Sequence, residues 1–360
     1  MPLDTIYLTR HGHRLNWTID YKTGTYSSQF PTPTGNPSDP TLTSHGVRQA
    51  HELAAHLLSE NVTPKPFRIY SSPFWRCLQT IQPSVEALDD AARKQKETAG
   101  TSKDIGSEAE VEIEIEDGAE FAVRVENGLG EWFGSTTFFN HPTPPSLTSL
   151  IQTLPRKTPV PFILDKARRT PILYTSPRGE SIPQLHARLA TTLAAIIAEV
   201  DAEITQLESA LPAEKRTSKA ILICSHAAPL IAIGRVLTGR MPEDVNEEDF
   251  HVYTAGLSTF RRRGVRSGGG GEMRGGAGRE WEGVLAPGTR VMRAGVTVPD
   301  WEGGKGVGGG WDCVVNGDCS FLSGGAERGW HFNGEESFDT GLMAEAGVDG
   351  KEEVRIGTKL

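Results

Sequence analysis

The sequence predicts an α/β protein, and three observations support this class. An apolar and β-branched run at residues 3–8 predicts a buried N-terminal strand. The continuous apolar run Ala220–Cys224 is typical of a strand that is buried on both faces. Leucines and isoleucines recur at helical spacing elsewhere, most clearly over residues 183–207. With 360 residues, the chain is long enough for one large α/β domain with insertions.

The composition argues against several classes of protein. A formal net charge of −9 disfavours non-specific nucleic-acid binding, so we expect no direct nucleic-acid partner. Four scattered cysteines without C-x-x-C spacing indicate neither a zinc site nor a disulfide framework. We find no signal segment at the N-terminus and no apolar run near the roughly 20 residues that a membrane span needs. These features predict a cytoplasmic or nuclear protein without a membrane partner.

The predicted N-terminal strand ends in a cluster of basic residues, Arg10-His11-Gly12-His13-Arg14. In an open α/β sheet, residues that follow a strand lie at the carboxyl edge of the sheet, where ligands bind. Like charges repel unless an anion lies between them, and guanidinium groups match the oxygens of phosphate. The cluster therefore predicts a phosphate site, with a solvated basic turn as the alternative.

The residues that follow predict a loop and then a helix. Residues 15–41 are rich in Pro, Thr, Ser, Asn and Gly, which predicts a long loop that covers a substrate. A helical apolar stripe begins at Val47 and ends near Leu58, and Thr43 or Ser44 is the expected N-cap.

A second short strand, at residues 67–70, repeats the pattern of the first. It ends in a loop that carries Arg76, and a helix follows over residues 78–85. Two predicted strands thus end in loops that carry arginine.

The middle of the chain has a different composition. Residues 89–120 are rich in Lys, Glu, Gly, Ser and Asp, which predicts a solvated acidic insertion. The alternation at residues 110–116 is a candidate edge strand within it. Apolar alternation then leads into Glu126–Trp132. Residues 140–180 are proline-rich and predict irregular structure, before Pro183 opens a long helix.

A third buried strand, Ala220–Cys224, is followed directly by Ser225 and His226. A helix from Pro229 to Leu237 is expected to stop at Gly239. We expect a further strand over residues 252–260.

This pattern divides the chain into two parts. An α/β domain is expected over residues 1–263. Residues 264–360 are glycine-rich and loop-dominated, and we expect this extension to pack on the main domain.

Histidine, arginine and glutamate side chains thus recur at predicted strand ends or in the loops that follow them. These residues and the motifs around them resemble those of the histidine phosphatase superfamily, also called the phosphoglycerate mutase-like superfamily. The resemblance extends over roughly residues 3–260, and its motifs occur in the order of the family. They are LTRHG at Leu8–Gly12, LTSHGVRQA at Leu42–Ala50, SSPFWRCLQT at Ser71–Thr80, ENGLGEW at Glu126–Trp132, GESIPQLHAR at Gly179–Arg188 and ICSHAAP at Ile223–Pro229.

The resemblance implies a three-layer α/β/α sandwich with a mostly parallel central sheet. It also implies phosphomonoester hydrolysis in two steps, in which His11 is the nucleophile and forms a phosphohistidine. His226 would belong to the catalytic set as well. The phosphoryl oxygens would be bound by four cationic side chains, those of Arg10, Arg14, Arg76 and His226.

The same resemblance implies that Glu126 is the general acid and base, with Glu131 as the alternative. It implies no metal and no cofactor, because the arginines already supply positive charge. Two positions depart from the family. His13 lies where many relatives carry glutamate, and Ala227-Ala228 replaces a turn that is commonly glycine-rich.

The expected substrate is a phosphorylated small molecule or a phosphopeptide. The motifs around Trp75 and Trp132 are most similar to the eukaryotic branch that includes ecdysteroid-phosphate and STS-type phosphatases. The extension resembles that of fungal proteins related to the 55-kDa tau subunit of transcription factor IIIC. This second resemblance supports a non-catalytic or weakly catalytic interaction subunit as the alternative, in a homodimer or a larger complex.

Phosphoglycerate mutase activity is the less favoured enzymatic alternative.

Overall fold

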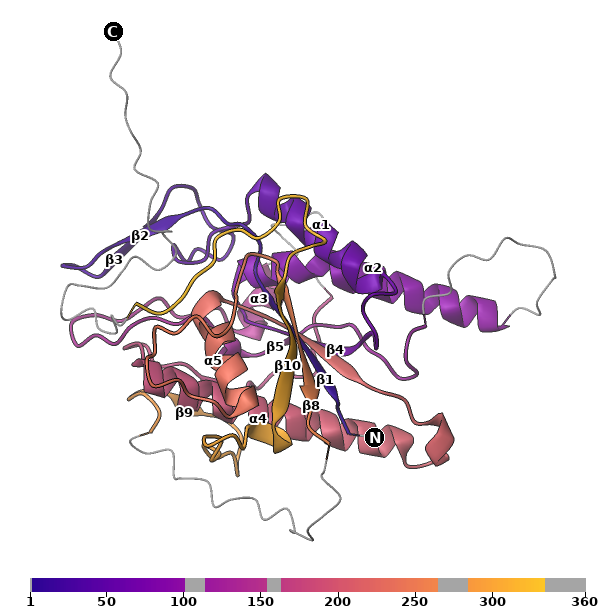
Figure 1. The fold of residues 1–360 in the computed structure, drawn as a ribbon. Coiled ribbons are helices and arrows are strands. Elements are labelled where there is room, and N and C mark those ends of the chain that lie inside the picture. The colour runs from indigo at the N-terminus through magenta and orange to yellow at the C-terminus, as the bar shows by residue number, and fades with distance from the viewer. Residues whose placement is uncertain (1, 101–113, 154–162, 265–283, 334–360) are drawn as a thin grey trace.

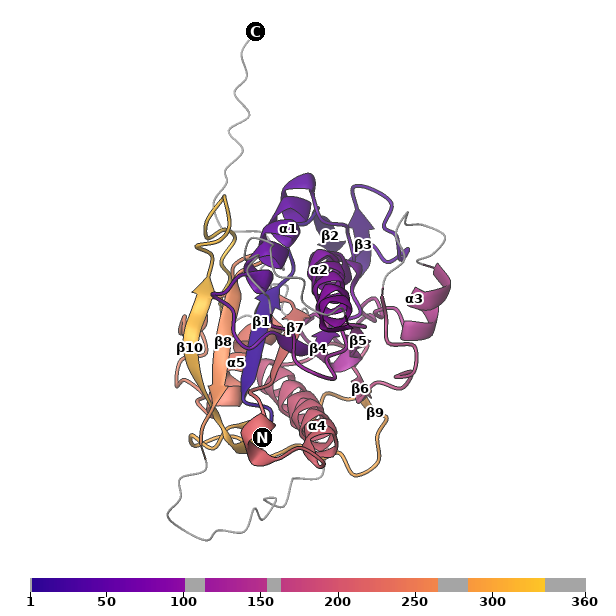
Figure 2. The same cartoon turned by 90° about the vertical axis from the view of Figure 1, so that its right-hand side faces the viewer.

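The computed structural model describes residues 2–100, 114–153, 163–264 and 284–333. Within these ranges, six strands form one sheet with helices on both of its faces, so the protein has three layers (Figures 1 and 2). In sheet order the strands are β10 (Trp311–Asp318), β8 (Leu257–Arg262), β1 (Thr5–Arg10), β7 (Ala220–Ser225), β4 (Pro66–Ser71) and β5 (Arg124–Val125).

Four neighbouring strands of this sheet, β1, β7, β4 and β5, run parallel to one another. Strand β8 pairs antiparallel with β1, and β10 pairs antiparallel with β8. The expected α/β fold with a mostly parallel central sheet is therefore confirmed. In register, Arg10 lies opposite Ser225, and Ser71 lies opposite Cys224. The carboxyl ends of β1, β7 and β4 consequently meet at one edge of the sheet.

The helices form two layers, and in the described ranges none is long and apolar enough to cross a membrane. They are α1 (Ser44–Leu58), α2 (Trp75–Gly100), α3 (Leu147–Thr153), α4 (Ile182–Glu208) and α5 (Ala227–Thr238). Side chains of β1 alternate between the layers. Ile6 and Leu8 pack in the cluster with α4 and α5, whereas Tyr7 packs with α1, α2 and α3. A parallel strand that is covered on both faces has this continuous apolar character.

The helix ends follow local sequence signals. The Thr43 hydroxyl accepts a hydrogen bond from the Gly46 N–H, so Thr43 is the N-cap of α1. Ser181 and Gln184 form a reciprocal capping box at the start of α4. Gly239 ends α5 with φ of 75°, a left-handed conformation that glycine adopts without steric cost.

The segment predicted as a loop at residues 15–41 contains regular structure. An antiparallel hairpin forms from β2 (Trp17–Asp20) and β3 (Thr25–Ser28). Its turn is stabilised by the Asp20 carboxylate, which accepts hydrogen bonds from the Lys22 N–H and the Thr23 hydroxyl. The short strands were missed because polar residues dominate them.

Helix α2 continues to Gly100, beyond the start of the predicted insertion at residue 89. The Lys and Glu residues that suggested a solvated segment are also good helix formers, as are the Ala and Gln residues among them. Most of the candidate edge strand at residues 110–116 lies outside the described residues. The proline-rich stretch contains α3 and the short strand β6 (Leu173–Tyr174).

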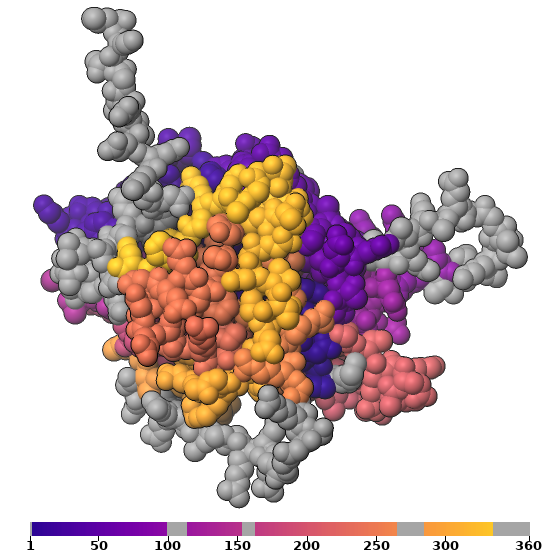
Figure 3. Space-filling view, in the orientation of Figure 1, coloured from indigo at the N-terminus to yellow at the C-terminus, as the bar shows by residue number. Residues whose placement is uncertain are grey.

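The extension contributes strands that the sequence did not predict. Strand β10 completes one edge of the main sheet, and β9 (Arg290–Val291) pairs with β6. Trp311 anchors β10, because its side chain is fully buried and its indole N–H donates to the Val307 carbonyl. Figure 3 shows the described part of the extension in orange to yellow, with its yellow residues beside the orange residues of α5 and β8.

A buried ion pair fixes the loop that follows β5. The guanidinium group of Arg188 binds the Glu180 carboxylate, with Nε at 2.8 and 2.9 Å from its two oxygens. It also donates to the carbonyls of Gly128 and Gly130, at 2.8 and 3.0 Å. Both side chains of the pair are buried. This ion pair therefore positions the loop that leads to Glu131.

We predict that Arg188→Met strongly destabilises the protein, because it leaves the Glu180 carboxylate buried without its partner. Loss of one member of a buried pair costs about 3–5 kcal/mol of unfolding free energy. The matched control is Arg240→Met, which removes an exposed arginine paired with Glu247 and should cost about 0–1 kcal/mol. Urea unfolding monitored by circular dichroism measures both values. Equal effects of the two substitutions would contradict this role of Arg188.

Candidate active site

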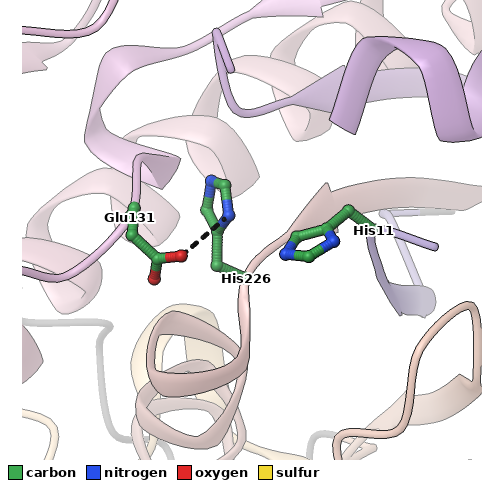
Figure 4. A group of neighbouring side chains, drawn as sticks. All are labelled: His11, Glu131 and His226. Carbon is green, nitrogen blue, oxygen red and sulfur yellow. Dashed lines mark ion pairs between the residues drawn. The ribbon is translucent and has the colours of Figure 1, made fainter. Parts of the chain in front are cut away.

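Two histidines from distant parts of the chain meet at the carboxyl edge of the sheet. His11 follows β1 and His226 follows β7, and the backbone N–H of His11 donates to the Ser225 carbonyl at 3.1 Å. Their ring centroids lie 5.3 Å apart at an interplanar angle of 63°. Figure 4 shows both imidazoles together with the side chain of Glu131.

The His11 imidazole is held in one tautomer. Its Nδ1 lies 2.9 Å from the Gly12 carbonyl oxygen, which can only accept, so Nδ1 carries the proton. Burial lowers the pKa of His11 well below its ordinary value, and the positive charges of Arg76 and His226 lower it further. The ring is therefore neutral near pH 7, and its Nε2 presents a lone pair.

The His226 imidazole is fully buried and contacts polar groups through both nitrogens. Its Nε2 lies 2.8 Å from the Ser72 hydroxyl, and its Nδ1 lies 3.3 Å from a Glu131 carboxylate oxygen. The Cys77 sulfur lies 3.6 Å from Nε2. Burial lowers the pKa of His226, but negative charge on Cys77 and Glu131 outweighs it and raises the pKa above the ordinary value. This environment favours the imidazolium form.

The Glu131 carboxylate lies between two cationic groups. One oxygen is 3.0 Å from a terminal nitrogen of Arg76 and 3.3 Å from Nδ1 of His226, the contact drawn as a dashed line in Figure 4. Burial raises the pKa of Glu131, but His226, Arg76 and Arg14 together lower it well below the usual range. Glu131 is therefore ionised in the absence of a ligand.

Arg76 lies at the start of α2 and is completely buried. Besides Glu131, its guanidinium group contacts the Ser38 carbonyl at 2.9 Å and the Asp39 carboxylate at 3.4 Å. Burial raises the pKa of Asp39 to about 6, although Arg76 opposes this shift. Asp39 belongs to the long loop before α1, so this loop helps to balance the charge of the site.

Arg10 and Arg14 line the pocket in front of His11. Its volume is about 30 Å³, and its wall is completed by Glu131 and by aromatic and small side chains, those of Trp132, Ala227, Ala228 and Trp330. The guanidinium group of Arg10 donates to the Val252 carbonyl at 2.8 Å. Burial and the neighbouring Arg76 lower the pKa of Arg14 to about 9. Two buried cations on one wall make this pocket suited to an anion.

Glu126 occupies a different position from Glu131. Its carboxylate accepts hydrogen bonds from the backbone N–H groups of Ile172 and Gly128, and it lies 3.7 Å from Arg168. Burial raises the pKa of Glu126, against the effect of these hydrogen bonds. It does not line the pocket of His11. Glu131, the alternative candidate for the general acid, therefore lies beside the histidines. Glu126 instead caps the turn at Asn127–Leu129.

The extension supplies part of the pocket through residues 327–332, which we call the roof segment. The carbonyl of Arg328 accepts a hydrogen bond from Arg10, and the carboxylate of Glu327 lies 2.7 Å from Nε2 of His45 in α1. Trp330 packs edge-on against Trp132, with ring centroids 6.3 Å apart. The roof segment therefore links the pocket to α1 and to the loop that carries Glu131.

His11, Glu131 and His226 also form a possible metal-ligand set, since their ligand atoms lie within 4.8 Å of one another. Three such donors suit zinc in isolation. Here, however, Arg76 binds the same Glu131 carboxylate, and Arg10 and Arg14 line the same pocket. Their positive charge opposes a metal cation, so this set of residues fits an anion better.

Of the six expected site residues, Arg10, His11 and Arg14 line the pocket. Arg76 and His226 contact the Glu131 carboxylate in its wall, and Glu126 lies apart from it. Sequence reasoning missed the roles of Asp39, Ser72 and Trp330. Trp330 lies in an aromatic and glycine pattern near the C-terminus, but nothing in that pattern specifies which surface it covers.

Comparison with known proteins supports the predicted resemblance. Residues 6–100 match the family model of the histidine phosphatase superfamily (branch 1). The chain is also similar to the transcription factor tau 55 kDa subunit of Saccharomyces cerevisiae, at 26% identity over 364 residues. This match covers 100% of the chain but 63% of the yeast protein, so the chain spans less than two thirds of that relative. The resemblance to histidine phosphatases and to the tau 55-kDa proteins is confirmed.

The chain is also similar to solved structures, of which two are described here. The ecdysone phosphate phosphatase from Bombix mori, in complex with tungstate, is 15% identical with a TM-score of 0.44, over 77% of this chain and 98% of that one. The alpha-ribazole phosphatase from Shigella flexneri is 17% identical with a TM-score of 0.34, over 72% of this chain and 91% of that one.

We predict that His11 stays neutral in the folded protein at pH values where an ordinary histidine takes up a proton. The unperturbed midpoint is about 6.5, and burial beside cations lowers it. The imidazole resonances of His11, assigned by comparison with His11→Ala, should not titrate between pH 8 and 6. A midpoint at or above 6.5 would contradict this electrostatic description.

Proposed function

We propose that the protein is a phosphomonoester hydrolase that works through a phosphohistidine on His11. The observation that carries this proposal is the neutral His11 imidazole, whose Nδ1–H is bound to the Gly12 carbonyl while Nε2 is free to act as a nucleophile. Arg10 and Arg14 line the same pocket and attract the oxygens of a phosphoryl group. A neutral nucleophile facing two cations suits attack on a phosphate dianion.

In the first step, the Nε2 lone pair of His11 forms a bond to phosphorus, and the bond from phosphorus to the ester oxygen breaks. The leaving oxygen takes a proton from a general acid. Glu131 is our candidate, because its carboxylate lies beside both histidines, whereas Glu126 is bound to backbone N–H groups elsewhere. Glu131 thus replaces Glu126 in the role that the sequence suggested.

Glu131 must carry a proton to act as an acid, although it is ionised in the free site. The charges that keep its pKa low are those of His226, Arg76 and Arg14. A phosphoryl dianion that binds to the same cations cancels much of this positive potential and so raises the pKa of Glu131. Substrate binding and protonation of Glu131 are therefore coupled in this proposal.

In the second step, Glu131 accepts a proton from a water molecule whose oxygen attacks phosphorus. The bond from phosphorus to Nε2 of His11 breaks, which releases inorganic phosphate and restores the neutral imidazole. Arg10, Arg14, Arg76 and His226 stabilise the negative charge on the phosphoryl oxygens in both steps.

We further propose that the ester group of the substrate lies against Trp132 and Trp330, which line the pocket beside His11. An apolar or aromatic ester group would gain contact area there. Phosphopeptides and phosphorylated small molecules with such a group are the substrate classes that we favour.

The first prediction of this proposal concerns the nucleophile. Wild-type protein should release 4-nitrophenol from 4-nitrophenyl phosphate, and His11→Ala should reduce the rate to the uncatalysed background, because no other group takes over the bond to phosphorus. A spectrophotometric assay measures the rate. Trapping of acid-labile, base-stable phosphate on the wild-type chain, but not on the variant, reports the intermediate directly. If folded wild-type protein released no 4-nitrophenol above the background rate, the proposal would be wrong.

A second prediction separates the two glutamates. Glu131→Gln removes the acid and should lower kcat by about 10²–10⁴-fold. The matched variant Glu126→Gln replaces a side chain that lies outside the pocket with one of the same size. It should change kcat by a few-fold at most. Activity should be compared at equal fractions of folded protein, judged by thermal unfolding. The reverse ranking would assign the acid to Glu126.

A second candidate function is that of an interaction subunit in a nuclear complex, with or without catalysis. The whole chain, extension included, matches the tau 55 kDa subunit. In addition, the edge strand β10 exposes Val314 and Val315 at 54% and 40% of their surface. Exposed apolar residues on an edge strand favour pairing with another chain.

The double substitution Val314→Asp and Val315→Asp tests this second candidate. Both side chains are exposed, so the fold and the hydrolysis of 4-nitrophenyl phosphate should be unchanged, while partners identified by mass spectrometry after affinity purification should be lost. Retention of the same partners by the variant would exclude β10 as the docking edge.

A further inference from the structure

The role proposed for Arg10 depends on the direction of its guanidinium group. Nη1 of Arg10 donates to two backbone carbonyls, that of Val252 at 2.8 Å and that of Arg328 in the roof segment. These two acceptors use both N–H groups of Nη1. Because the guanidinium group is planar and rigid, fixing Nη1 fixes the plane of the whole group. The roof segment therefore orients an arginine that lines the His11 pocket.

The backbone has an unusual conformation on both sides of Arg10. Within the described ranges, Ala255 and Arg328 are the non-glycine residues with positive φ, at 56° and 50°. Both contact Arg10, since the N–H of Ala255 donates to its carbonyl at 3.1 Å and the carbonyl of Arg328 accepts from its guanidinium group. Such conformations are disfavoured for residues with a side chain and persist only where surrounding contacts hold them. The contacts that hold the roof segment therefore determine where the Arg328 carbonyl lies.

Glu327 supplies the contacts that hold the roof segment next to Arg328. Its carbonyl accepts from the Thr254 N–H at 3.1 Å, and its carboxylate lies 2.7 Å from Nε2 of His45 and 3.4 Å from Nε2 of Gln49. His45 and Gln49 both belong to α1. The Glu327 carboxylate thus ties the roof segment to a helix of the main domain.

The tautomer of His45 determines which kind of group Glu327 must offer. Nδ1 of His45 lies 2.6 Å from a terminal nitrogen of Arg48, which can only donate, so Nδ1 accepts and Nε2 carries a proton. That N–H donates to the Glu327 carboxylate. The oxygen of a glutamine side chain can accept the same hydrogen bond, whereas alanine offers no acceptor.

We propose that Glu327 is a positioning residue for Arg10. Its carboxylate holds the roof segment on α1, and the Arg328 carbonyl then directs the Arg10 guanidinium group toward the phosphoryl oxygens. The inference rests on the proposed phosphatase reaction, in which Arg10 binds those oxygens. It gives the C-terminal extension a part in phosphate binding.

Three variants test this proposal on the full-length protein. Glu327→Ala should raise the KM for 4-nitrophenyl phosphate and the Kd for inorganic phosphate by about tenfold or more, because a charge-assisted hydrogen bond to the anion is weakened. Glu327→Gln keeps an acceptor for His45 and should stay within about threefold of the wild type. The matched control Glu248→Ala removes an exposed contact of the roof segment, that with His331, and should leave both constants unchanged.

The change in KM separates positioning from a loss of folded protein. A variant that is only less folded has fewer active molecules, which lowers kcat and leaves KM as it was. Steady-state kinetics measure KM, and calorimetric titration measures the Kd for phosphate. Unchanged KM and Kd in Glu327→Ala would overturn the proposal, as would equal effects of Glu327→Ala and Glu248→Ala.

A measurement on Arg10 itself keeps this test separate from the test of the phosphatase reaction. The side-chain ¹H–¹⁵N signal of Arg10 Nε, assigned by comparison with Arg10→Lys, should shift in Glu327→Ala and stay in place in Glu248→Ala. If the wild type is inactive and this signal still shifts, the proposed reaction fails while the positioning of Arg10 stands. A signal that does not move in Glu327→Ala refutes the role of Glu327, whatever the activity.

Discussion

The buried cluster of positive charge at the carboxyl ends of β1, β7 and β4 is the constraint on which this structure depends. Arg14 and Arg76 would repel each other, and both are buried. The protein offsets this repulsion with carboxylates that come from loops, those of Asp39 and Glu131. The loops before α1 and after β5 are therefore held against the sheet by charge as well as by apolar packing.

Under the proposed mechanism, this balance gives the same carboxylate both a structural and a chemical role. Glu131 neutralises Arg76 and His226 when the site holds no anion. In the proposed reaction, a phosphoryl group that binds these cations frees Glu131 for proton transfer. Its position depends on Arg188, which binds the carbonyls of Gly128 and Gly130 just before it. A buried ion pair far along the sequence thus supports the geometry of the pocket.

Much of the fold and most of the pocket could be predicted from sequence, because they depend on local signals. Apolar strands followed by basic residues identified His11, Arg76 and His226, and each of these follows a strand of the observed sheet. The choice between Glu126 and Glu131 could not be made in this way. It depends on which carboxylate is bound to the Ile172 N–H, a contact across 46 positions of sequence.

The extension was harder to predict for a related reason. Glycine and aromatic residues indicated loops, and β10 carries exposed residues on a short, irregular edge strand, so its pattern is weak. The placement of Trp330 over His11 depends on contacts with α1 and with Trp132. Such contacts between distant segments leave no periodic signal in the sequence.

The location of the roof segment affects the order in which the pocket is assembled during translation. The ribosome releases the N-terminal strand first, and His11 and His226 can meet once α5 has emerged. Trp330 emerges about one hundred residues later than His226. A nascent chain or a product of premature termination before β10 would thus hold His11, Arg10 and Arg14 in a pocket that lacks the wall formed by Trp330 and is open to water and to anions.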